Sequence, residues 1–170
     1  MEKLVRYDNG LRLIVENIPS FRSVVTGFWV GTGSSNENDS NNGISHFTEH
    51  VMFKGTDKMS AYDIAGSFER LGANINAFTS KECTCYYAKS IDENSEKCFS
   101  LLSDIFFDSV FPAEELDKER SVILEEINMV EDSPEDICYD LLAKARYDGH
   151  PLGKTILGPA ENVKRFSAED

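Results

Sequence analysis

The sequence predicts an α+β fold in which helices cover one face of an antiparallel-rich sheet. Segments that alternate apolar and polar residues occur as neighbours joined by short turns, which is typical of antiparallel strand pairs. Segments with apolar residues at helical spacing follow one another in a block. Of the 170 residues, 41% are hydrophobic and 11% are aromatic, which is enough to build a core. Strand pairs combined with a block of helices place the helices on one face of the sheet.

The first two strands are expected to form a hairpin. Leu4–Tyr7 and Leu11–Glu16 flank the turn Asp8-Asn9-Gly10, and an Asn-Gly pair tolerates the positive φ angles of a tight hairpin turn. Val24–Val30 is an apolar run and predicts a buried strand. Residues 31–43 are rich in Ser, Asn and Gly and have no periodicity, so they predict a loop.

The remaining segments comprise one more strand pair and several helices. Asn74–Thr79 and Thr84–Ser90 predict an antiparallel pair. Helical spacing covers five further segments: Ile44 to about Lys54, Ser60 to about Leu71, Ser95–Ser109, Glu114–Val130, and Pro134 to about Tyr147.

The last four residues form a capping-box pattern, in which Ser167 is followed three residues later by Asp170. Such a pattern predicts the start of a helix. We therefore expect residues 1–170 to be the N-terminal part of a longer polypeptide.

Charge and hydropathy argue against nucleic acid and membranes as partners of this chain. The chain has 17 basic and 30 acidic side chains, a net charge of −13, and residues 91–140 alone hold 16 acids against 3 bases. Such a chain repels phosphate backbones, so nucleic acid is not an expected partner. No run approaches the roughly 18 apolar residues of a membrane span. The N-terminus resembles no leader or transit segment, so we expect a cytoplasmic protein without membrane contact.

Two of the three histidines, His46 and His50, lie four residues apart on one predicted helix. Four residues advance a helix by about 400°, so both imidazoles project from the same face, as two ligands of a tetrahedral Zn²⁺ require. Glu49 lies about 60° from His46 on the same face. A lone histidine pair at this spacing usually lies on the protein surface and binds no metal. With Glu49 beside the pair, we predict a metal site.

The segment His46-Phe47-Thr48-Glu49-His50 is the inverted zincin motif, HxxEH. Neutral imidazoles hold zinc and leave a coordination position for water. Zinc lowers the pKa of that water to about 7, and a nearby carboxylate that is not a ligand accepts its proton. Glu49 fits this role of general base.

A catalytic zinc usually has a third protein ligand, and the long helix over Glu114–Val130 offers candidates. The residues three and four positions from Glu126 are all apolar, which predicts a carboxylate set in the middle of a core stripe. A charge there is costly unless it is paired or binds a metal. Glu125 has Ser121 and Asn128 beside it and is expected to face water. We predict that Glu126 is the third ligand.

Glu119 lies almost two turns before Glu126 on the same helix face. We predict that it joins Glu49 in the catalytic set by orienting a zinc ligand or the base. The sequence leaves one alternative open, in which Glu126 is a buried carboxylate paired with Arg120 or a lysine.

Further motifs occur in a fixed order through nearly the whole chain. They are Gly31-Thr32-Gly33-Ser34, Gly43 to His50, Phe53-Lys54-Gly55-Thr56, Asn76-Ala77-Phe78-Thr79-Ser80 with Glu82, Tyr86 and Tyr87, Glu119-Arg120 through Glu126, Pro151-Leu152-Gly153 and Gly158-Pro159. In this ordered set the chain resembles the N-terminal part of the insulinase/pitrilysin family of zinc peptidases. The similarity is to the branch that includes the mitochondrial processing peptidase and its bacterial relatives. Thr48 stands where the family often has Leu.

The resemblance implies a metallopeptidase-like domain of a two-half clamshell, with residues 1–170 as the N-terminal catalytic domain. It implies one Zn²⁺ held by His46, His50 and Glu126, the last of which agrees with the helix-face argument. The implied reaction is endopeptidase cleavage of short or unfolded peptides, with a zinc-bound water activated by Glu49.

The resemblance also implies how peptides bind. A peptide adds a strand to the edge of the sheet, and Asn76 and Ala77 contact its backbone, a mode that tolerates many sequences. In the family the opposite half usually contributes Arg and Tyr residues to substrate binding. A C-terminal half or a partner subunit is therefore expected to close the chamber, a homo-oligomer is a further option, and the isolated chain is expected to be weakly active or inactive.

Two other readings compete with the peptidase. The family includes non-catalytic subunits that serve as substrate-binding or assembly modules and have lost the metal residues, whereas His46, Glu49, His50 and Glu126 are all present here. A purely structural zinc site is disfavoured, because such sites are usually closed by four Cys or His ligands and the cysteines do not cluster with the histidines.

Overall fold

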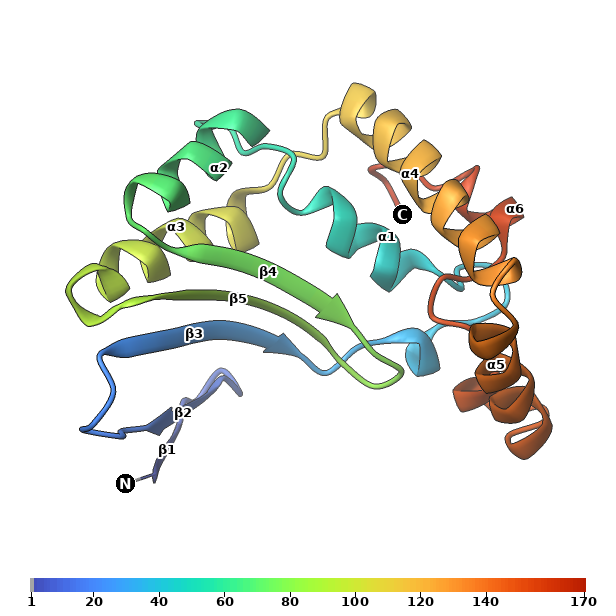
Figure 1. Ribbon diagram of the computed structural model, residues 1–170, viewed down its shortest axis with the longest axis horizontal. Coiled ribbons are helices and arrows are strands. Elements are labelled where there is room, and N and C mark those ends of the chain that lie inside the picture. The colour runs from blue at the N-terminus through green and yellow to red at the C-terminus, as the bar shows by residue number, and fades with distance from the viewer. Residues whose placement is uncertain (1) are drawn as a thin grey trace.

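The computed structural model describes residues 2–170 and is built around a three-stranded antiparallel sheet of order β3-β5-β4 (Figure 1). Its strands are β3 (Ser23–Val30), β4 (Asn74–Thr79) and β5 (Thr84–Ile91). The strands β1 (Glu2–Arg6) and β2 (Arg12–Glu16) form a separate antiparallel hairpin that lies beyond β3. The predicted α+β class with antiparallel sheets is confirmed.

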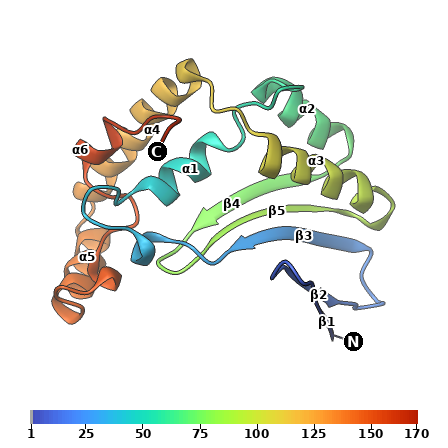
Figure 2. The same ribbon diagram turned by 180° about the vertical axis from the view of Figure 1, so that it is seen from behind.

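Six helices accompany the strands in the described residues: α1 (Ile44–Val51), α2 (Ala61–Arg70), α3 (Ser95–Asp108), α4 (Ala113–Glu131), α5 (Pro134–Arg146) and α6 (Ala160–Val163). The helix α3 packs on β3 and β5, while α1 contacts β4 and β5. The helices α4 and α6 lie beyond α1, so that α1 is enclosed between them and the sheet (Figure 2). Helices therefore cover one face of the sheet, as predicted.

Element boundaries match the sequence analysis to within a few residues, with two differences. The first helix ends at Val51 rather than near Lys54. The chain leaves the helix after Met52, since the N–H of Lys54 bonds to the carbonyl oxygen of Val51 in a tighter turn, and Gly55 then has a φ of 151°, a conformation that only glycine adopts readily. The short helix α6 was not predicted, because four residues are too few to show a periodicity.

The helix α1 separates two hydrophobic clusters. One lies between the sheet and the helices α2 and α3, and Met52, just after α1, belongs to it. The other includes Phe47 and Val51 of α1 together with Ile123 of α4 and Phe166 near the C-terminus. Because Phe47 and Val51 are only 2% and 3% exposed, the apolar stripe of α1 fixes the rotation of this helix about its axis.

The opposite face of the sheet carries large apolar side chains without a helical layer over them. Val25 and Trp29 of β3 are 62% and 68% exposed, so the prediction of a buried strand over Val24–Val30 is wrong, because this face of the sheet has no layer to cover it. In the separate hairpin, every residue of β2 is exposed as well. All four cysteines are free thiols. In the part of the chain that the structure describes, no helix combines the length and apolar character needed to span a bilayer.

Gly158 is a point where two distant segments touch, and its replacement is expected to be destabilising. Its φ is 70°, and a Cβ atom there would lie 2.2 Å from the carbonyl oxygen of Asn42. Gly72 has a similar φ of 60° with nothing within 4 Å. We expect Gly72→Ala to lower the free energy of unfolding by about 1–2 kcal/mol through backbone strain alone. Gly158→Ala should lower it by at least about 3 kcal/mol, because the clash adds to the strain.

Urea denaturation of the two variants measures this difference. Equal losses for Gly72→Ala and Gly158→Ala would show that the close approach of Gly158 to Asn42 does not exist in solution.

Candidate metal centre

His46 and His50 lie one turn apart on α1, and their rings meet edge to face, with centroids 4.6 Å apart and an interplanar angle of 66°. His46 is buried, with 7% of its surface exposed, and the side chain of His50 is 21% exposed. The apolar stripe described above turns this helix face toward α4. The sequence predicted this geometry because an i, i+4 pair on a helix must share a face.

Glu126 reaches this pair from α4. One of its carboxylate oxygens, Oε2, lies 3.6 Å from Nε2 of His46 and 3.5 Å from Nε2 of His50. Both separations are longer than a normal N–H···O hydrogen bond. The three ligand atoms lie within 4.8 Å of one another, and no other group of this kind occurs in residues 2–170.

The two His–Glu separations fit a tetrahedral zinc ion. Bonds of about 2.0–2.2 Å place the ligand atoms of a tetrahedral zinc about 3.4 Å apart. The two measured His–Glu separations of 3.5 and 3.6 Å are close to this value. The donor set of two imidazoles and one carboxylate is one that zinc uses with a coordination position left open. The residues present therefore fit the metal that the sequence predicted.

Glu119 contacts the other nitrogen of His50. Its Oε2 lies 3.2 Å from Nδ1 of His50, and its Oε1 lies 2.6 Å from Nζ of Lys54. The Glu119 side chain is only 11% exposed, so the lysine compensates a charge that would be costly alone. A carboxylate on the second nitrogen of a histidine fixes the ring and leaves Nε2 free for a metal.

Glu49 lies on the same helix and is held by the sheet. Its Oε2 accepts a hydrogen bond of 2.5 Å from the hydroxyl of Thr79, the last residue of β4. Burial raises the pKa of the Glu49 carboxyl above its usual range, although the Thr79 hydrogen bond acts in the opposite direction. A carboxylate with a raised pKa is a better proton acceptor than one exposed to water.

Burial also sets the protonation of His46. Loss of hydration, together with the neighbouring His50, lowers the pKa of His46 to about 4, although the charge of Glu37 acts in the opposite direction. The imidazole is therefore neutral near pH 7, which is the form that binds metal ions.

The surroundings of Glu126 differ from the prediction in one respect. Its side chain is 41% exposed, and its neighbours Val122 and Met129 are 50% and 71% exposed. Glu126 thus lies at the edge of the core stripe rather than in its middle. The stripe that packs against α1 instead contains Ile123 and Ile127.

The alternative of a Glu126–Arg120 pair is not what the structure shows. The guanidinium of Arg120 donates to the carbonyl oxygens of Lys164 and Phe166 and pairs with Asp117. It is thereby engaged with the C-terminal segment and with its own helix.

Asn76 and Ala77 lie on β4, which has a neighbour only on one side because the strand order is β3-β5-β4. The main-chain N–H of Ala77 donates a 2.8 Å hydrogen bond to the side-chain oxygen of Asn76. This edge strand ends at Thr79, whose hydroxyl donates to Glu49. The peptide-binding edge predicted for β4 is therefore directly connected to the HxxEH helix.

Sequence reasoning missed the roles of Lys54 and Thr79. Both lie in motifs that carried the family resemblance, which was the only available signal. Lys54 follows the end of α1, so helical spacing could not place it beside Glu119. Thr79 meets Glu49 only because β4 docks against α1.

Comparison with known proteins identifies the family of this chain. The family model described as insulinase (peptidase family M16) matches residues 12–160. The chain belongs to the M16 peptidase family. The predicted resemblance to the insulinase/pitrilysin peptidases is thereby confirmed.

Relatives of this M16 chain include a protein named as a zinc protease and a subunit named as a processing peptidase. The zinc protease YmxG of Bacillus subtilis is 52% identical over 169 residues, which are 99% of this chain and 41% of YmxG. The mitochondrial-processing peptidase subunit beta of Rattus norvegicus is 41% identical over 163 residues, 96% of this chain and 33% of that subunit.

The crystal structure of a protease from Helicobacter pylori has the same fold. It matches with a TM-score of 0.92 at 25% identity, covering 99% of this chain and 41% of that one. The M16 chain described here thus spans no more than 41% of the length of these relatives.

Proposed function

We propose that this chain is the N-terminal catalytic domain of a zinc endopeptidase that cleaves short or unfolded peptides. The observation that carries the proposal is the convergence of two Nε2 atoms on one Glu126 oxygen at 3.5 and 3.6 Å, with Glu49 on the same helix. The names of the relatives, a zinc protease and a processing peptidase subunit, support peptide hydrolysis as the reaction.

Each side chain near the metal centre has a separate role in the proposed reaction. When bound, zinc polarises the scissile carbonyl and acidifies a water molecule. Glu49 accepts the proton of the attacking water and returns it to the leaving amine. Thr79 holds the Glu49 carboxylate, while Glu119 orients His50 and so acts as a positioning residue rather than on the substrate.

The free edge of β4 supports a peptide-binding role for Asn76 and Ala77. A peptide that pairs with this edge gains main-chain hydrogen bonds whatever its sequence, and it must be extended to do so. This requirement favours short or unfolded substrates. The Asn76 amide, which now bonds to the N–H of Ala77, would have to release that group to the peptide.

The proposal includes a second half, supplied by the same polypeptide or by a partner subunit. A second copy of the chain in a homo-oligomer is the further option. The M16 relatives are more than twice as long as this chain, and the sheet face around Trp29 is open. A cytoplasmic location remains part of the proposal, and four free thiols fit a reducing compartment.

The chain alone is expected to bind zinc but to hydrolyse peptides poorly. All predicted ligands lie within residues 46–126, so the metal centre assembles locally. An opposing wall is needed to position the peptide, and positioning contributes up to about 7–11 kcal/mol in favourable cases. We therefore expect turnover at least about 100-fold below that of the two-half protein.

The test is the hydrolysis of a flexible fluorogenic peptide by the chain alone and by the complete two-half protein. Equal turnover by a monomeric short chain would refute the need for a second half. Tight peptide binding without hydrolysis by the complete, zinc-loaded protein would instead favour a substrate-binding module.

A further inference from the structure

Glu37 is a buried carboxylate at the beginning of the HxxEH helix. It lies in the loop over residues 31–43, and 4% of its surface is exposed. Its Oε2 accepts hydrogen bonds from the N–H of Gly43 at 2.8 Å and from Nδ2 of Asn42 at 2.9 Å. Its Oε1 accepts from the N–H of Ser45 at 2.8 Å. The carboxylate thus spans the start of α1, immediately before His46.

Within residues 2–170, no other side chain caps this helix. The N-cap residue is Gly43, which has no side chain and a φ of 101°. The first N–H groups of a helix have no partner within the helix, and a negative charge there is favoured by the helix dipole. Glu37 supplies both the acceptors and the charge from six residues upstream.

The Glu37 carboxylate is held by these donors and forms no ion pair in residues 2–170. The nearby ammonium of Lys154 donates instead to the main-chain oxygen of Glu37 and pairs with Asp39. Burying a charge without a counter-ion is costly, and a neutral residue in this loop would avoid that cost. The arrangement therefore points to a requirement for charge at the start of α1.

The two histidines differ in how they are held. Nδ1 of His50 contacts Glu119, which fixes that ring. Nδ1 of His46 is buried and has no hydrogen-bond partner in the described part of the chain. The position of the His46 ring therefore depends on the placement of its own main chain, which is the segment that Glu37 holds.

We infer that Glu37 is a positioning residue of the zinc centre, acting on His46 through the first turn of α1. The inference rests on the proposed function, since it presupposes that His46 binds zinc.

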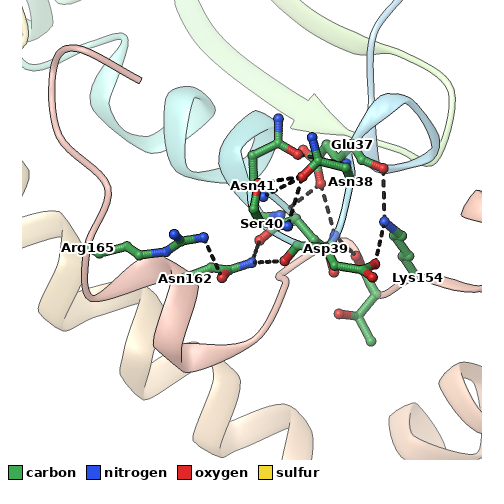
Figure 3. Close-up of polar contacts among 11 residues, drawn as sticks. Glu37, Asn38, Asp39, Ser40, Asn41, Lys154, Asn162 and Arg165 are labelled. Atoms are coloured by element: carbon green, nitrogen blue, oxygen red, sulfur yellow. Dashed lines mark hydrogen bonds and ion pairs between the residues drawn. The ribbon is translucent and has the colours of Figure 1, made fainter.

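The far side of the loop is braced by the C-terminal segment (Figure 3). Nδ2 of Asn162 donates to the main-chain oxygens of Asp39 and Asn42, both at 3.0 Å. Asn42 in turn donates to the carbonyl oxygen of Thr155 at 2.9 Å. Glu37 is therefore enclosed between α1 and a segment more than 100 residues away, with little freedom to move.

Zinc affinity, measured with this chain by competition with a chromophoric chelator, tests the inference. Glu37→Gln keeps the size and shape of the side chain but removes its negative charge. It also replaces one accepting carboxylate oxygen by an NH₂ group, which donates and therefore cannot bond to the main-chain N–H that it faces. We expect zinc binding to weaken about 10–100-fold. Asp39→Asn is the matched control, because it removes a 99% exposed carboxylate from the same loop, and it should stay within about threefold of the unchanged chain.

A Co²⁺ spectrum separates positioning from general stability. The visible absorption of Co²⁺-loaded Glu37→Gln should change in position and intensity, because the ligand geometry changes. Leu102→Ala removes a fully buried side chain from the cluster under the sheet, so it lowers stability but should leave the affinity and the spectrum unchanged.

Three results would overturn the inference. They are zinc affinity of Glu37→Gln within threefold of the unchanged chain, an equal loss in Asp39→Asn, or an equal loss in Leu102→Ala.

If Glu37→Gln does not fold, Glu37→Asp takes its place, since it keeps the charge but is too short to reach both N–H groups. Unchanged affinity in Glu37→Asp would then overturn it. Absence of zinc binding by the unchanged chain would refute the proposed function itself, an outcome distinct from these.

Discussion

Glu49→Gln in the complete two-half protein is expected to retain zinc and to lose about 10³–10⁴-fold in peptide hydrolysis. The amide has the size of the carboxylate and can still bond to the hydroxyl of Thr79, which donates to Glu49 at 2.5 Å. It cannot accept a proton from the attacking water. The loss should therefore appear in kcat, with little change in the binding of the peptide.

The control for this variant is Glu125→Gln, the same chemical change at an exposed position on α4. It should leave hydrolysis within about threefold of the unchanged protein, as expected for a surface substitution. Zinc content is measured in parallel. A Glu49→Gln protein that keeps its zinc and at least a third of the original turnover would show that Glu49 is not the base.

Removing a zinc ligand should also have a large effect, in this case on zinc binding itself. We expect His46→Ala and Glu126→Ala to weaken zinc binding at least about 100-fold, since each removes one of three protein ligands. Glu125→Ala should bind zinc like the unchanged chain. Glu126 and Glu125 are adjacent in sequence, but only the oxygen of Glu126 lies 3.5–3.6 Å from both imidazoles.

Metal analysis after dialysis, combined with chelator titration, measures these losses. The comparison of the two neighbouring glutamates is the decisive one, because both variants remove the same charge from the same helix. Zinc binding that survives Glu126→Ala but is lost in Glu125→Ala would refute the assignment of the α4 face.

The two histidines of the metal centre are held in place by different side chains. His50 has its ring fixed by Glu119, and Glu119 is compensated by Lys54 at 2.6 Å. His46 has no such partner for its ring within residues 2–170, and its support is the buried Glu37 at the start of α1. The two histidines of the motif thus depend on different parts of the fold.

The sequence by itself determined the features that depend on local geometry. Helical spacing placed His46, Glu49 and His50 on one face, because 3.6 residues per turn is a property of the backbone and not of its neighbours. Hydrophobic spacing on the long helix likewise favoured Glu126 over Glu125. Strand pairs and helix bounds followed from the same periodicities, to within a few residues.

Only the tertiary structure decided how the helices and the sheet meet. The 41% exposure of Glu126 depends on which side of α4 has a neighbour, and no spacing rule contains that information. The hydrogen bond from Thr79 to Glu49 exists because β4 docks against α1, thirty residues away in the chain. The role of Glu37 was invisible in a loop without periodicity, because its partners are main-chain N–H groups, which every sequence possesses and only the folded chain brings to one point.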